Sequence, residues 1–533
     1  MTRSTTALVP HQELQAASEE DPAAPLVTFL DDRMYTRSQL LDASREVCGA
    51  LQARGISRGD RVVILMGNRV EFLTTWFGIA MAGGVAVPLN TAMMGSVLEH
   101  MLSLTEPRFL LSESEFVPQV VNALGDSEYL EHFICLGPTT VTRTENFQDF
   151  LGGAVAGTVV TADPWDLANI LFTSGTTGPS KGVMWSHGTG RAMAEGALHV
   201  MDYTASDVVF TCLPLFHSNG LFTSFLAGLM RRATVVVAPR FSASKFWQQI
   251  TESGATTVNM LGSMAPLLWQ QETSAWEDSH RLRRALVIPP PLEHFAEFEA
   301  RFKVQCTELY GLTDAGIPVG IPAGLSKPGS CGKELPGWQC DLVNEWDQPV
   351  AANEPGELVL RPTEPFSGQL GYYRMPEETI GAWRNLWFHT GDLMRRDDDG
   401  WFYFLDRSKD SIRRSGENIS SFEVEQAILA HDDVADTAVY AVPAEFGEDE
   451  VMAAVVLKGG STTSATEIIE WCRVRLPYFA VPRYVDLRQS IPRTATAKIQ
   501  KHLLRAAGIT DTTYDEGPSG RRAREQRAAH PSR

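Results

Sequence analysis

The chain has 533 residues, of which 44% are hydrophobic and 21% are charged, so it is long enough for several domains with buried cores. Its formal net charge of −19 argues against a nucleic-acid partner, because binding to a phosphate backbone requires a basic surface. Its 7 cysteines are scattered without a C-x-x-C pair. This spacing indicates neither a zinc site nor a disulfide framework, and it favours a reducing compartment.

The first residues, MTRSTTALVPHQELQ, lack the apolar core of a secretory signal. The longest apolar stretch runs from Phe72 to Leu89 and contains threonines, glycines and a proline. A buried helix, a glycine turn and a strand explain this composition better than a membrane span does. We therefore expect a cytoplasmic protein without a membrane span, acting on small molecules as a monomer or homodimer.

Strand-like and helical patterns alternate in two long regions, residues 37–160 and residues 165–325. This alternation predicts layered α/β structure. The first region contains an expected strand at 61–66, a helix at 70–82 and a strand at 85–88. In the second region, strands are expected at 208–212, 234–238 and 256–259.

The pattern changes after residue 328. Residues 328–405 contain frequent turns and short strand-like runs, which is typical of a small β-barrel. A compact α+β segment is expected from residue 410 to residue 508. The polar and basic residues 512–533 are predicted to be disordered.

The segment from Leu171 to Gly182, LFTSGTTGPSKG, carries the strongest chemical signal in the chain. Its glycines let backbone N–H groups approach an anion, and its hydroxyl groups add donors that rotate toward phosphate oxygens. Lys181 adds a mobile positive charge. These features predict a loop that binds a polyphosphate, and hence an enzyme that uses ATP.

Two other interpretations of this segment fit less well. In a P-loop, G-x-x-x-x-G-K-[ST], the second glycine would fall at Ser180 and a hydroxyl residue at Gly182. A P-loop lysine also opens a helix, whereas Val183-Met184-Trp185 predicts a strand. A flexible Gly/Ser/Thr linker is disfavoured because strand-like runs lie on both sides of the loop.

The order T-S-G-T-T-G-x-x-K-G resembles the phosphate loop of the adenylate-forming superfamily, which includes acyl-CoA synthetases, luciferases and the adenylation domains of peptide synthetases. Five further clusters follow in the family's order, and the similarity spans roughly residues 25–508. The resemblance implies an α/β fold. A large N-terminal domain, residues 1–408, would combine two layered α/β subdomains with a small distorted β-barrel. A small mobile α+β domain, residues 409–510, and a disordered tail, residues 511–533, would follow.

The resemblance implies that the phosphate loop holds the pyrophosphate part of ATP. The residues assigned to this role are Thr173, Ser174, Gly175, Thr176, Thr177, Gly178 and Lys181. Mg²⁺ would bridge the phosphates near Thr176 and Asp314, since Mg²⁺ takes oxygen ligands. Asp314 stands where the family has glutamate, in Y-G-L-T-D, and its side chain is one methylene shorter. It would therefore reach the ion either directly or through a water molecule.

The nucleoside would be bound by two later clusters. In Tyr310-Gly311-Leu312-Thr313, the tyrosine would stack on adenine and Thr313 would reach the phosphates. In W-F-H-T-G-D, the carboxylate of Asp392 would bind the ribose hydroxyls. Arg407 would contact the ribose or the phosphates.

Two lysines would control catalysis. Lys498, in P-R-T-A-T-A-K, would be the adenylation lysine, and Lys409 would be the pivot between the two domains. Rotation about Lys409 would withdraw Lys498 and let the pantetheine arm of CoA pass Gly416.

The acid would bind around a histidine. In Pro214-Leu215-Phe216-His217, the histidine would lie near the forming bond, and its presence weighs against a free α-amino acid as the substrate. The pocket wall is expected to consist of His217, Ser218, Asn219, Met260, Leu261 and Gly311. Pro289-Pro290-Pro291 replaces a glycine-rich turn of many relatives and is expected to reshape this pocket.

The resemblance implies an AMP-forming acyl-CoA synthetase that uses ATP, Mg²⁺ and CoA, with crotonobetaine/carnitine-CoA ligases as the most similar subgroup. One alternative is an adenylating ligase that transfers the activated group to an amine or a carrier-protein thiol, or that activates nitrite for diazotisation. Pyrophosphate release without CoA would favour it. Another alternative is a binding module without catalysis, which absence of ATP binding would support.

Overall fold

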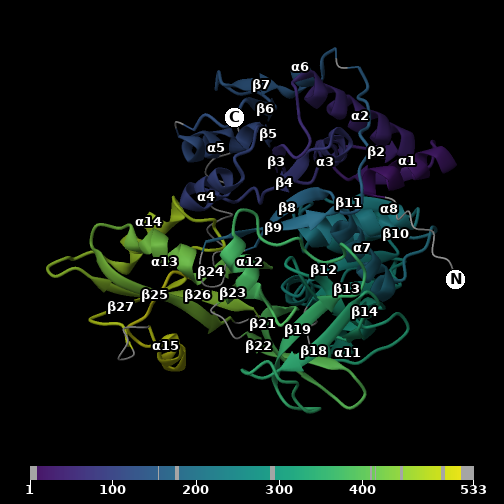
Figure 1. Ribbon diagram of the computed structural model, residues 1–533. Coiled ribbons are helices and arrows are strands. Elements are labelled where there is room, and N and C mark those ends of the chain that lie inside the picture. Colours follow the sequence, from purple (N-terminus) through teal and green to yellow (C-terminus); the bar gives the residue numbers. More distant parts are fainter. Residues whose placement is uncertain are drawn as a thin grey trace.

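The computed structural model describes residues 9–125, 127–153, 155–173, 179–288, 295–407, 411–414, 416–444, 448–493 and 499–517. Figure 1 shows two central sheets flanked by helices at the top and right, a smaller β unit at the bottom, and the C-terminal elements in green and yellow at the left. Among the described residues, none of the helices has the length and apolar character needed to cross a bilayer.

The helices cover both faces of the central sheets, and in the C-terminal unit α13 and α14 lie on one face of the sheet and α15 on the other (Figure 1). The α-helices are α1 (Pro10–Glu20), α2 (Arg37–Ala53), α3 (Val70–Ala82), α4 (Gly95–Thr105), α5 (Val117–Leu124), α6 (Phe147–Leu151), α7 (His187–Met201), α8 (Ala227–Met230), α9 (Phe246–Ser253), α10 (Met264–Trp269), α11 (Phe295–Phe302), α12 (Pro376–Ala382), α13 (Ser421–Leu429), α14 (Ala465–Arg473) and α15 (Lys501–Ala507). Short 3-10 helices η1 (Ser114–Phe116) and η3 (Ala275–Asp278) and a π-helix, η2 (Asn219–Leu226), complete the set.

One central sheet carries the phosphate-loop segment. Its strand order is β7-β6-β5-β3-β4-β8-β9, and its pairs are parallel except for the antiparallel pair β8–β9. The strands are β3 (Arg61–Leu65), β4 (Val85–Pro88), β5 (Phe109–Glu113), β6 (His132–Leu136), β7 (Thr144–Asn146), β8 (Leu167–Thr173) and β9 (Lys181–Ser186). The expected strands on both sides of the phosphate loop are therefore confirmed.

The second central sheet has the order β14-β13-β12-β10-β11-β1-β2, and all its pairs are parallel except β1–β2. Its strands are β1 (Pro25–Phe29), β2 (Met34–Thr36), β10 (Val208–Thr211), β11 (Thr234–Val237), β12 (Thr257–Leu261), β13 (Arg284–Ile288) and β14 (Gln305–Thr307). Both central sheets thus confirm the predicted α/β layers, because parallel strands buried on both faces need helices on both sides.

Two small antiparallel sheets form the predicted distorted barrel. One has the order β15-β16-β17, and the other β18-β19-β21-β20, with β22 paired to β21. Their strands are β15 (Leu309–Leu312), β16 (Gly316–Gly320), β17 (Lys333–Glu334), β18 (Trp338–Val343), β19 (Gly356–Pro362), β20 (Trp383–Arg384), β21 (Trp387–Arg396) and β22 (Phe402–Arg407).

The C-terminal unit contains a hairpin and a four-stranded sheet. The hairpin pairs β23 (Ser411–Arg414) with β24 (Glu417–Ser420), and the sheet has the order β25-β26-β27-β28. The sheet strands are β25 (Val434–Pro443), β26 (Asp449–Leu457), β27 (Tyr484–Arg488) and β28 (Tyr514–Asp515).

The prediction of disorder from residue 511 onward is wrong for residues 511–517. Strand β28 pairs antiparallel with β27, and Asp515 and Glu516 form ion pairs with Arg483 and Arg473. The polar composition predicted a solvated tail. Instead, the backbone of β28 forms hydrogen bonds with the edge of β27, a strand that is distant in the chain. Residues 518–533 lie outside the described residues.

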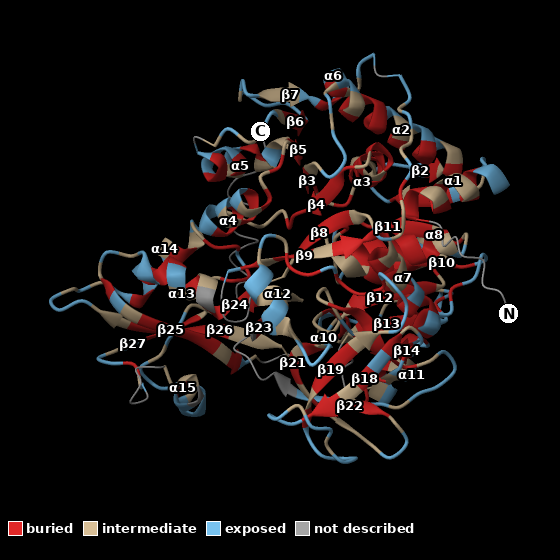
Figure 2. Ribbon diagram, in the orientation of Figure 1, coloured by how far each residue is buried: buried red, intermediate tan, exposed pale blue. Residues whose placement is uncertain are grey.

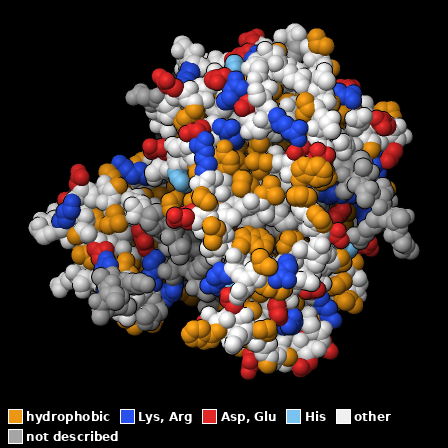
Figure 3. Space-filling model, viewed as in Figure 1, with side chains coloured by type: hydrophobic (Ala, Val, Ile, Leu, Met, Phe, Trp, Pro, Cys, Tyr) orange, Lys and Arg blue, Asp and Glu red, His pale blue; other side chains and the backbone are white. Residues whose placement is uncertain are grey.

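Hydrophobic side chains connect the units. The strands of the central sheets are largely buried, and the outer faces of the helices are exposed (Figure 2). Leu98 and Met101 of α4 belong to the same buried cluster as Ile412 and Val424 of the C-terminal unit. On the face seen in Figure 3, acidic and basic side chains are interspersed, and hydrophobic side chains gather near the middle.

Candidate active site

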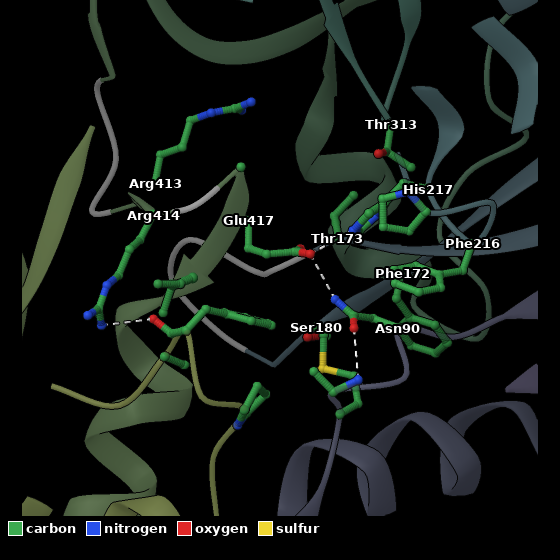
Figure 4. A pocket seen from close by; sticks show the side chains of 18 of the residues that line it. Asn90, Phe172, Thr173, Ser180, Phe216, His217, Thr313, Arg413, Arg414 and Glu417 are labelled. Carbon is green, nitrogen blue, oxygen red and sulfur yellow. Dashed lines mark hydrogen bonds and ion pairs between the residues drawn. The ribbon is translucent and has the colours of Figure 1, made fainter. Parts of the chain in front are cut away.

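A cavity of about 1370 Å³ lies where the central sheets, the small β-sheets and the C-terminal unit meet. Many of the N-terminal residues that line it lie at or just after strand ends, where loops leave the sheets. The hairpin β23–β24 and the end of α14 line it from the other side. Figure 4 shows side chains from both parts, including Thr173, His217 and Thr313 on one side and Arg413, Arg414 and Glu417 on the other.

The ends of β8 and β9 bring the phosphate-loop residues to this cavity. Thr173, the last residue of β8, and Lys181, the first residue of β9, both line it. The Nζ atom of Lys181 lies 4.6 Å from the centre of the Tyr372 ring. The loop residues Ser174, Gly175, Thr176, Thr177 and Gly178 lie outside the described residues.

Tyr372 connects the lysine to the predicted metal ligand. Its hydroxyl donates to Oδ1 of Asp314 at 2.5 Å, and its ring faces Lys181. Burial and then the charge of Asp314 raise the pKa of Tyr372 well above its ordinary value, so the phenol remains a donor. Asp314 lines the cavity as predicted, with its carboxylate already oriented.

The surroundings of Asp314 fit a Mg²⁺ ion that is held mainly by substrate. Among the described residues, histidine, cysteine, aspartate and glutamate do not gather in groups of three or more that could hold a metal ion. Mg²⁺ commonly takes one or two protein carboxylates together with phosphate oxygens and waters. The oriented carboxylate of Asp314, together with the oxygens of a bound phosphate group, matches that donor set.

The predicted nucleoside residues lie together on the small β-sheets. Asp392 of β21 lines the cavity, and its Oδ2 accepts a hydrogen bond from the hydroxyl of Tyr310 at 2.6 Å. The strand register places Arg407 of β22 opposite Asp392, and only the backbone of Arg407 is described. Gly311 and Thr313 also line the cavity, and Nε1 of Trp185 donates to the carbonyl oxygen of Thr313.

Tyr310 has a structural role that the sequence did not predict. Its ring is buried in the core of the small β-sheets and is not among the cavity-lining residues. Its hydrogen bond orients Asp392, so the contact with adenine stays a prediction.

The predicted acyl-site residues begin a helix with an unusual period. His217 and Ser218 precede the π-helix η2, which starts at Asn219, and all three residues line the cavity. Wider helical turns of this kind often occur at functional sites. The carbonyl oxygen of Asn219 accepts a hydrogen bond from the side-chain hydroxyl of Ser224, five residues later.

His217 is held by the C-terminal hairpin. Its Nε2 lies 2.8 Å from Oε1 of Glu417, and Nδ2 of Asn90 donates to the same oxygen at 2.9 Å. Burial opposes the charged form of His217, but the charge and hydrogen bond of Glu417 outweigh it and raise the pKa of the imidazole. Figure 4 shows Glu417 between His217 and Asn90.

The prediction that Met260 lines the acyl pocket is wrong. Met260 is 1% exposed and packs in the core around α9 and α10, whereas the next residue, Leu261, lines the cavity. Side chains alternate between the two faces of strand β12, so the neighbouring residue faces the opposite side. The prolines at 289–291 lie outside the described residues.

The C-terminal unit meets the rest of the chain at three further contacts, the first two of which line the cavity. The N–H and hydroxyl of Ser180 both donate to Oε1 of Glu423, the first at 2.8 Å. A Cβ atom on Gly416 would overlap Cδ1 of Leu261. A Cβ atom on Gly95 would lie 2.5 Å from the carbonyl oxygen of Arg475.

The two predicted catalytic lysines, Lys409 and Lys498, lie outside the described residues. Arg493 and Ile499, which flank the segment of Lys498, form an isolated β-bridge. Arg493 pairs with Asp436, and Ile499 packs against a hydrophobic cluster within the C-terminal unit. Neither flanking residue is among those that line the cavity.

Sequence reasoning missed Asn90, Tyr372 and the role of Ser180. Each acts through a partner that is far away in the chain, namely Glu417, Asp314 and Glu423. Nothing in the local pattern around these three residues pointed to those partners.

The two α/β sheets, the small β unit and the C-terminal unit around one phosphate-loop cavity define an adenylate-forming enzyme. The AMP-binding enzyme family matches residues 14–372, and the AMP-binding enzyme C-terminal domain matches residues 423–498. The chain belongs to the AMP-binding enzyme family.

A crotonobetaine/carnitine–CoA ligase from Citrobacter koseri is 30% identical over 488 residues, which cover 89% of this chain and 93% of the relative. The family match and this relative confirm the predicted superfamily and enzyme class, an AMP-forming acyl-CoA synthetase. They also confirm the expected similarity to crotonobetaine/carnitine-CoA ligases.

Two solved structures have similar sequence identity to this chain but different TM-scores against it. A double mutant of o-succinylbenzoate CoA synthetase (MenE) from Bacillus subtilis, bound with its product analogue OSB-NCoA, is 25% identical. The TM-score is 0.82, over 93% of this chain and 98% of that one. ATP-bound MatB from Rhodopseudomonas palustris is 26% identical, with a TM-score of 0.69 over 94% of this chain and 99% of that one.

Proposed function

We propose that this cavity joins a carboxylic acid to CoA in two steps, and that the acid combines an apolar body with hydrogen-bonding groups. The observation that carries the proposal is the joint position of Lys181, Asp392 and His217 on one cavity. They provide a phosphate end, a ribose end and an acyl end. Beside His217, the wall combines the polar Ser218 and Asn219 with apolar side chains, including Leu261.

In the first step, a carboxylate oxygen attacks the α-phosphorus of ATP. The new P–O bond forms the acyl-adenylate, and the bond to the β-phosphate oxygen breaks, so that pyrophosphate leaves. Negative charge grows on the leaving group, and fixed cations and donors stabilise it. We assign this role to Thr173, Lys181 and the loop between them, and we assign the carboxylate and α-phosphate to Lys498.

Mg²⁺ would be held by Asp314 together with the phosphates and by Thr176 of the loop. When bound, it would neutralise phosphate charge. The hydroxyl of Tyr372 donates a hydrogen bond that orients the carboxylate of Asp314, which lines the cavity.

In the second step, the thiol of CoA attacks the acyl carbon. A C–S bond forms, the bond to the AMP oxygen breaks, AMP leaves, and the thiol proton passes to solvent. We propose that the structure represents the arrangement for this step. The hairpin enters the cavity at Leu261 and His217. In contrast, Arg493 and Ile499, which flank the segment of Lys498, pair with each other and are not among the residues that line the cavity.

The test is a pyrophosphate-release screen over carboxylic acids and nitrite, with and without CoA. Crotonobetaine and carnitine come first, because the Citrobacter koseri relative is named for them. Release that yields an acyl-CoA product only in the presence of CoA supports the proposal. Release without any CoA product would instead support transfer to an amine, a carrier-protein thiol or another acceptor. An absence of release with every acid would contradict the proposal.

A further inference from the structure

A closed ring of hydrogen bonds holds both the backbone and the side chain of Asn219 at the acyl end of the cavity. Nδ2 of Asn259, in β12, donates to Oγ of Ser224 at 2.8 Å and to Oδ1 of Asn219 at 3.4 Å. Oγ of Ser224, in η2, in turn donates to the carbonyl oxygen of Asn219 at 3.1 Å. Asn259 and Ser224 are both 0% exposed, so water does not compete for the bond between them.

Tyr203 sets the direction of the donors in this ring. Its hydroxyl lies 3.0 Å from Oδ1 of Asn259, and burial raises the pKa of Tyr203 well above its ordinary value, so the phenol keeps its proton and donates it. The oxygen of the Asn259 amide therefore faces Tyr203, and its NH2 group faces Ser224 and Asn219. Because Ser224 uses its proton on a carbonyl oxygen, its hydroxyl accepts from Asn259.

The ring leaves the NH2 group of Asn219 for the cavity. The amide is planar and turns Oδ1 to Asn259, so Nδ2 points away from Asn259. Asn219 is half-buried and lines the cavity, and none of the residues that the structure describes accepts a hydrogen bond from its Nδ2. An amide NH2 group donates and does not accept. It therefore matches an oxygen acceptor on a ligand, and it does not neutralise a cation.

Recognition of an acid with a cationic end would need a different wall. A quaternary ammonium group is stabilised by a carboxylate or by the face of an aromatic ring. The carboxylate of Glu417, which lines the same cavity, already binds His217 and Asn90. The ring of Phe216 packs against the imidazole of His217, with 4.8 Å between the ring centres. Two groups that could face a cation near Asn219 are thus engaged by protein side chains.

We propose that Asn219 is a specificity-determining residue that donates from Nδ2 to an oxygen in the body of the acid, such as a hydroxyl, carbonyl or ether oxygen, and that disfavours acids ending in a quaternary ammonium. Tyr203 and Asn259 do not line the cavity and are positioning residues that act through Asn219. The inference rests on the proposed function, because it takes the wall beside His217 as the acyl site. It narrows the hydrogen-bonding groups of the acid to acceptors.

The experiment measures ATP–pyrophosphate exchange by the full chain with pairs of straight-chain acids over a range of chain lengths. One pair ends in methoxy or ethyl, so its members have the same shape and differ in the oxygen acceptor. The other pair ends in trimethylammonium or tert-butyl, so its members differ in charge. The ratio of kcat/KM within each pair is compared between variants, because a general loss of active protein cancels in that ratio.

Two variants test the two parts of the inference. Asn219→Asp replaces the donor NH2 by a carboxylate of the same shape, and Tyr203→Phe removes the proton that orients Asn259. Tyr440→Phe is the matched control for the second variant. It also removes a buried phenol hydroxyl, but this residue lies in a core cluster of the C-terminal unit, away from the ring. Thermal denaturation confirms that each variant is folded.

The wild-type chain should prefer the methoxy acid to its ethyl partner about tenfold at the best chain length, and it should prefer the tert-butyl acid to the trimethylammonium acid. Asn219→Asp should reverse both preferences, because a carboxylate repels an oxygen acceptor and attracts a cation. Tyr203→Phe should reduce the methoxy preference to about threefold, since the amide of Asn259 is then free to turn. Tyr440→Phe should leave both ratios as in the wild type.

Equal use of the methoxy and ethyl acids by the wild type, or a preference for the trimethylammonium acid, would overturn this inference and leave the proposed function intact. Unchanged ratios in folded Asn219→Asp would do the same, and equal effects of the two tyrosine changes would overturn the positioning role of Tyr203. Exchange with none of these acids, while the broader screen finds an active acid, would overturn this inference alone. A broader screen without any active acid would overturn both proposals.

Discussion

Nε2 of His217 and Oε1 of Glu417 lie 2.8 Å apart although 200 positions separate them in the chain. The histidine belongs to the acyl end of the cavity, and the glutamate belongs to the hairpin of the C-terminal unit. The two residues belong to different parts of the fold, so this contact forms only when the C-terminal unit is docked against the acyl end of the cavity.

Thioester formation should therefore depend on the charge of His217. Its pKa is raised above the usual 6.5, so the charged pair stabilises the docked hairpin fully below that pH. This stabilisation is lost as the pH rises through the raised pKa. The negative charge and hydrogen bond of Glu417 raise the pKa of His217, whereas the positive charge of Arg413 lowers it. Glu417→Gln should lower the rate of thioester formation from supplied acyl-adenylate about tenfold below pH 6.5. The difference from wild type should shrink at higher pH in stopped-flow assays. A constant ratio at all pH values would contradict this role.

Gly95 should be needed for domain docking. Its φ is +56°, and a Cβ atom there would lie 2.5 Å from the carbonyl oxygen of Arg475, so this arrangement leaves no space for alanine. Gly95→Ala should slow thioester formation from acyl-adenylate about tenfold while ATP–pyrophosphate exchange changes little.

Gly254→Ala provides the matched control for this change. Gly254 has a similar φ of +67°, but no described atom lies within 4 Å of the position that a Cβ atom would take there. Gly254→Ala should lower the free energy of unfolding only because alanine is strained at a positive φ. The ratio of the rates of the two half-reactions should not change. If both variants alter that ratio equally, backbone strain and not domain contact explains the result.

Lys498→Ala should separate the two half-reactions. It removes the positive charge that we assign to the carboxylate and α-phosphate, so acyl-adenylate formation should be abolished. Thioester formation from supplied acyl-adenylate should be largely retained, because the thiol step uses the other domain arrangement. Pyrophosphate exchange and single-turnover CoA acylation measure the two steps, and equal loss in both would refute the two-state assignment.

Buried Glu308 should make stability depend on pH. Burial raises its pKa to about 8, so the folded chain favours the protonated form. The free energy of unfolding should therefore fall as the pH rises from the ordinary glutamate pKa of 4.5 through about 8. Glu308→Gln keeps the shape without the charge, and relative to wild type it should gain about 4 kcal/mol of stability at pH 8 but only about 1 kcal/mol at pH 5. Urea unfolding at the two pH values checks this, and parallel curves would contradict it.

Much of the architecture could be predicted from local patterns. The helix at 70–82 and the strand at 85–88 match α3 and β4 residue for residue, because periodic hydrophobicity and the Gly83-Gly84 turn are local signals. Asp392 and Arg407 were assigned to one nucleoside site, and the strand register brings their backbones together. The error at Met260 came from treating neighbouring strand residues as one wall, although β12 turns only Leu261 to the cavity.

The sequence by itself determined the reaction class, since glycines, hydroxyls, one lysine and the later carboxylates express their chemistry through residue type and spacing. Only the tertiary structure decided which distant groups pair: Glu417 with His217, Glu423 with Ser180, and Asp314 with Tyr372. It also decided that residues 514–515 close a sheet edge. Such pairs depend on how separate units pack against each other, and no local pattern in the chain encodes the identity of a partner hundreds of residues away.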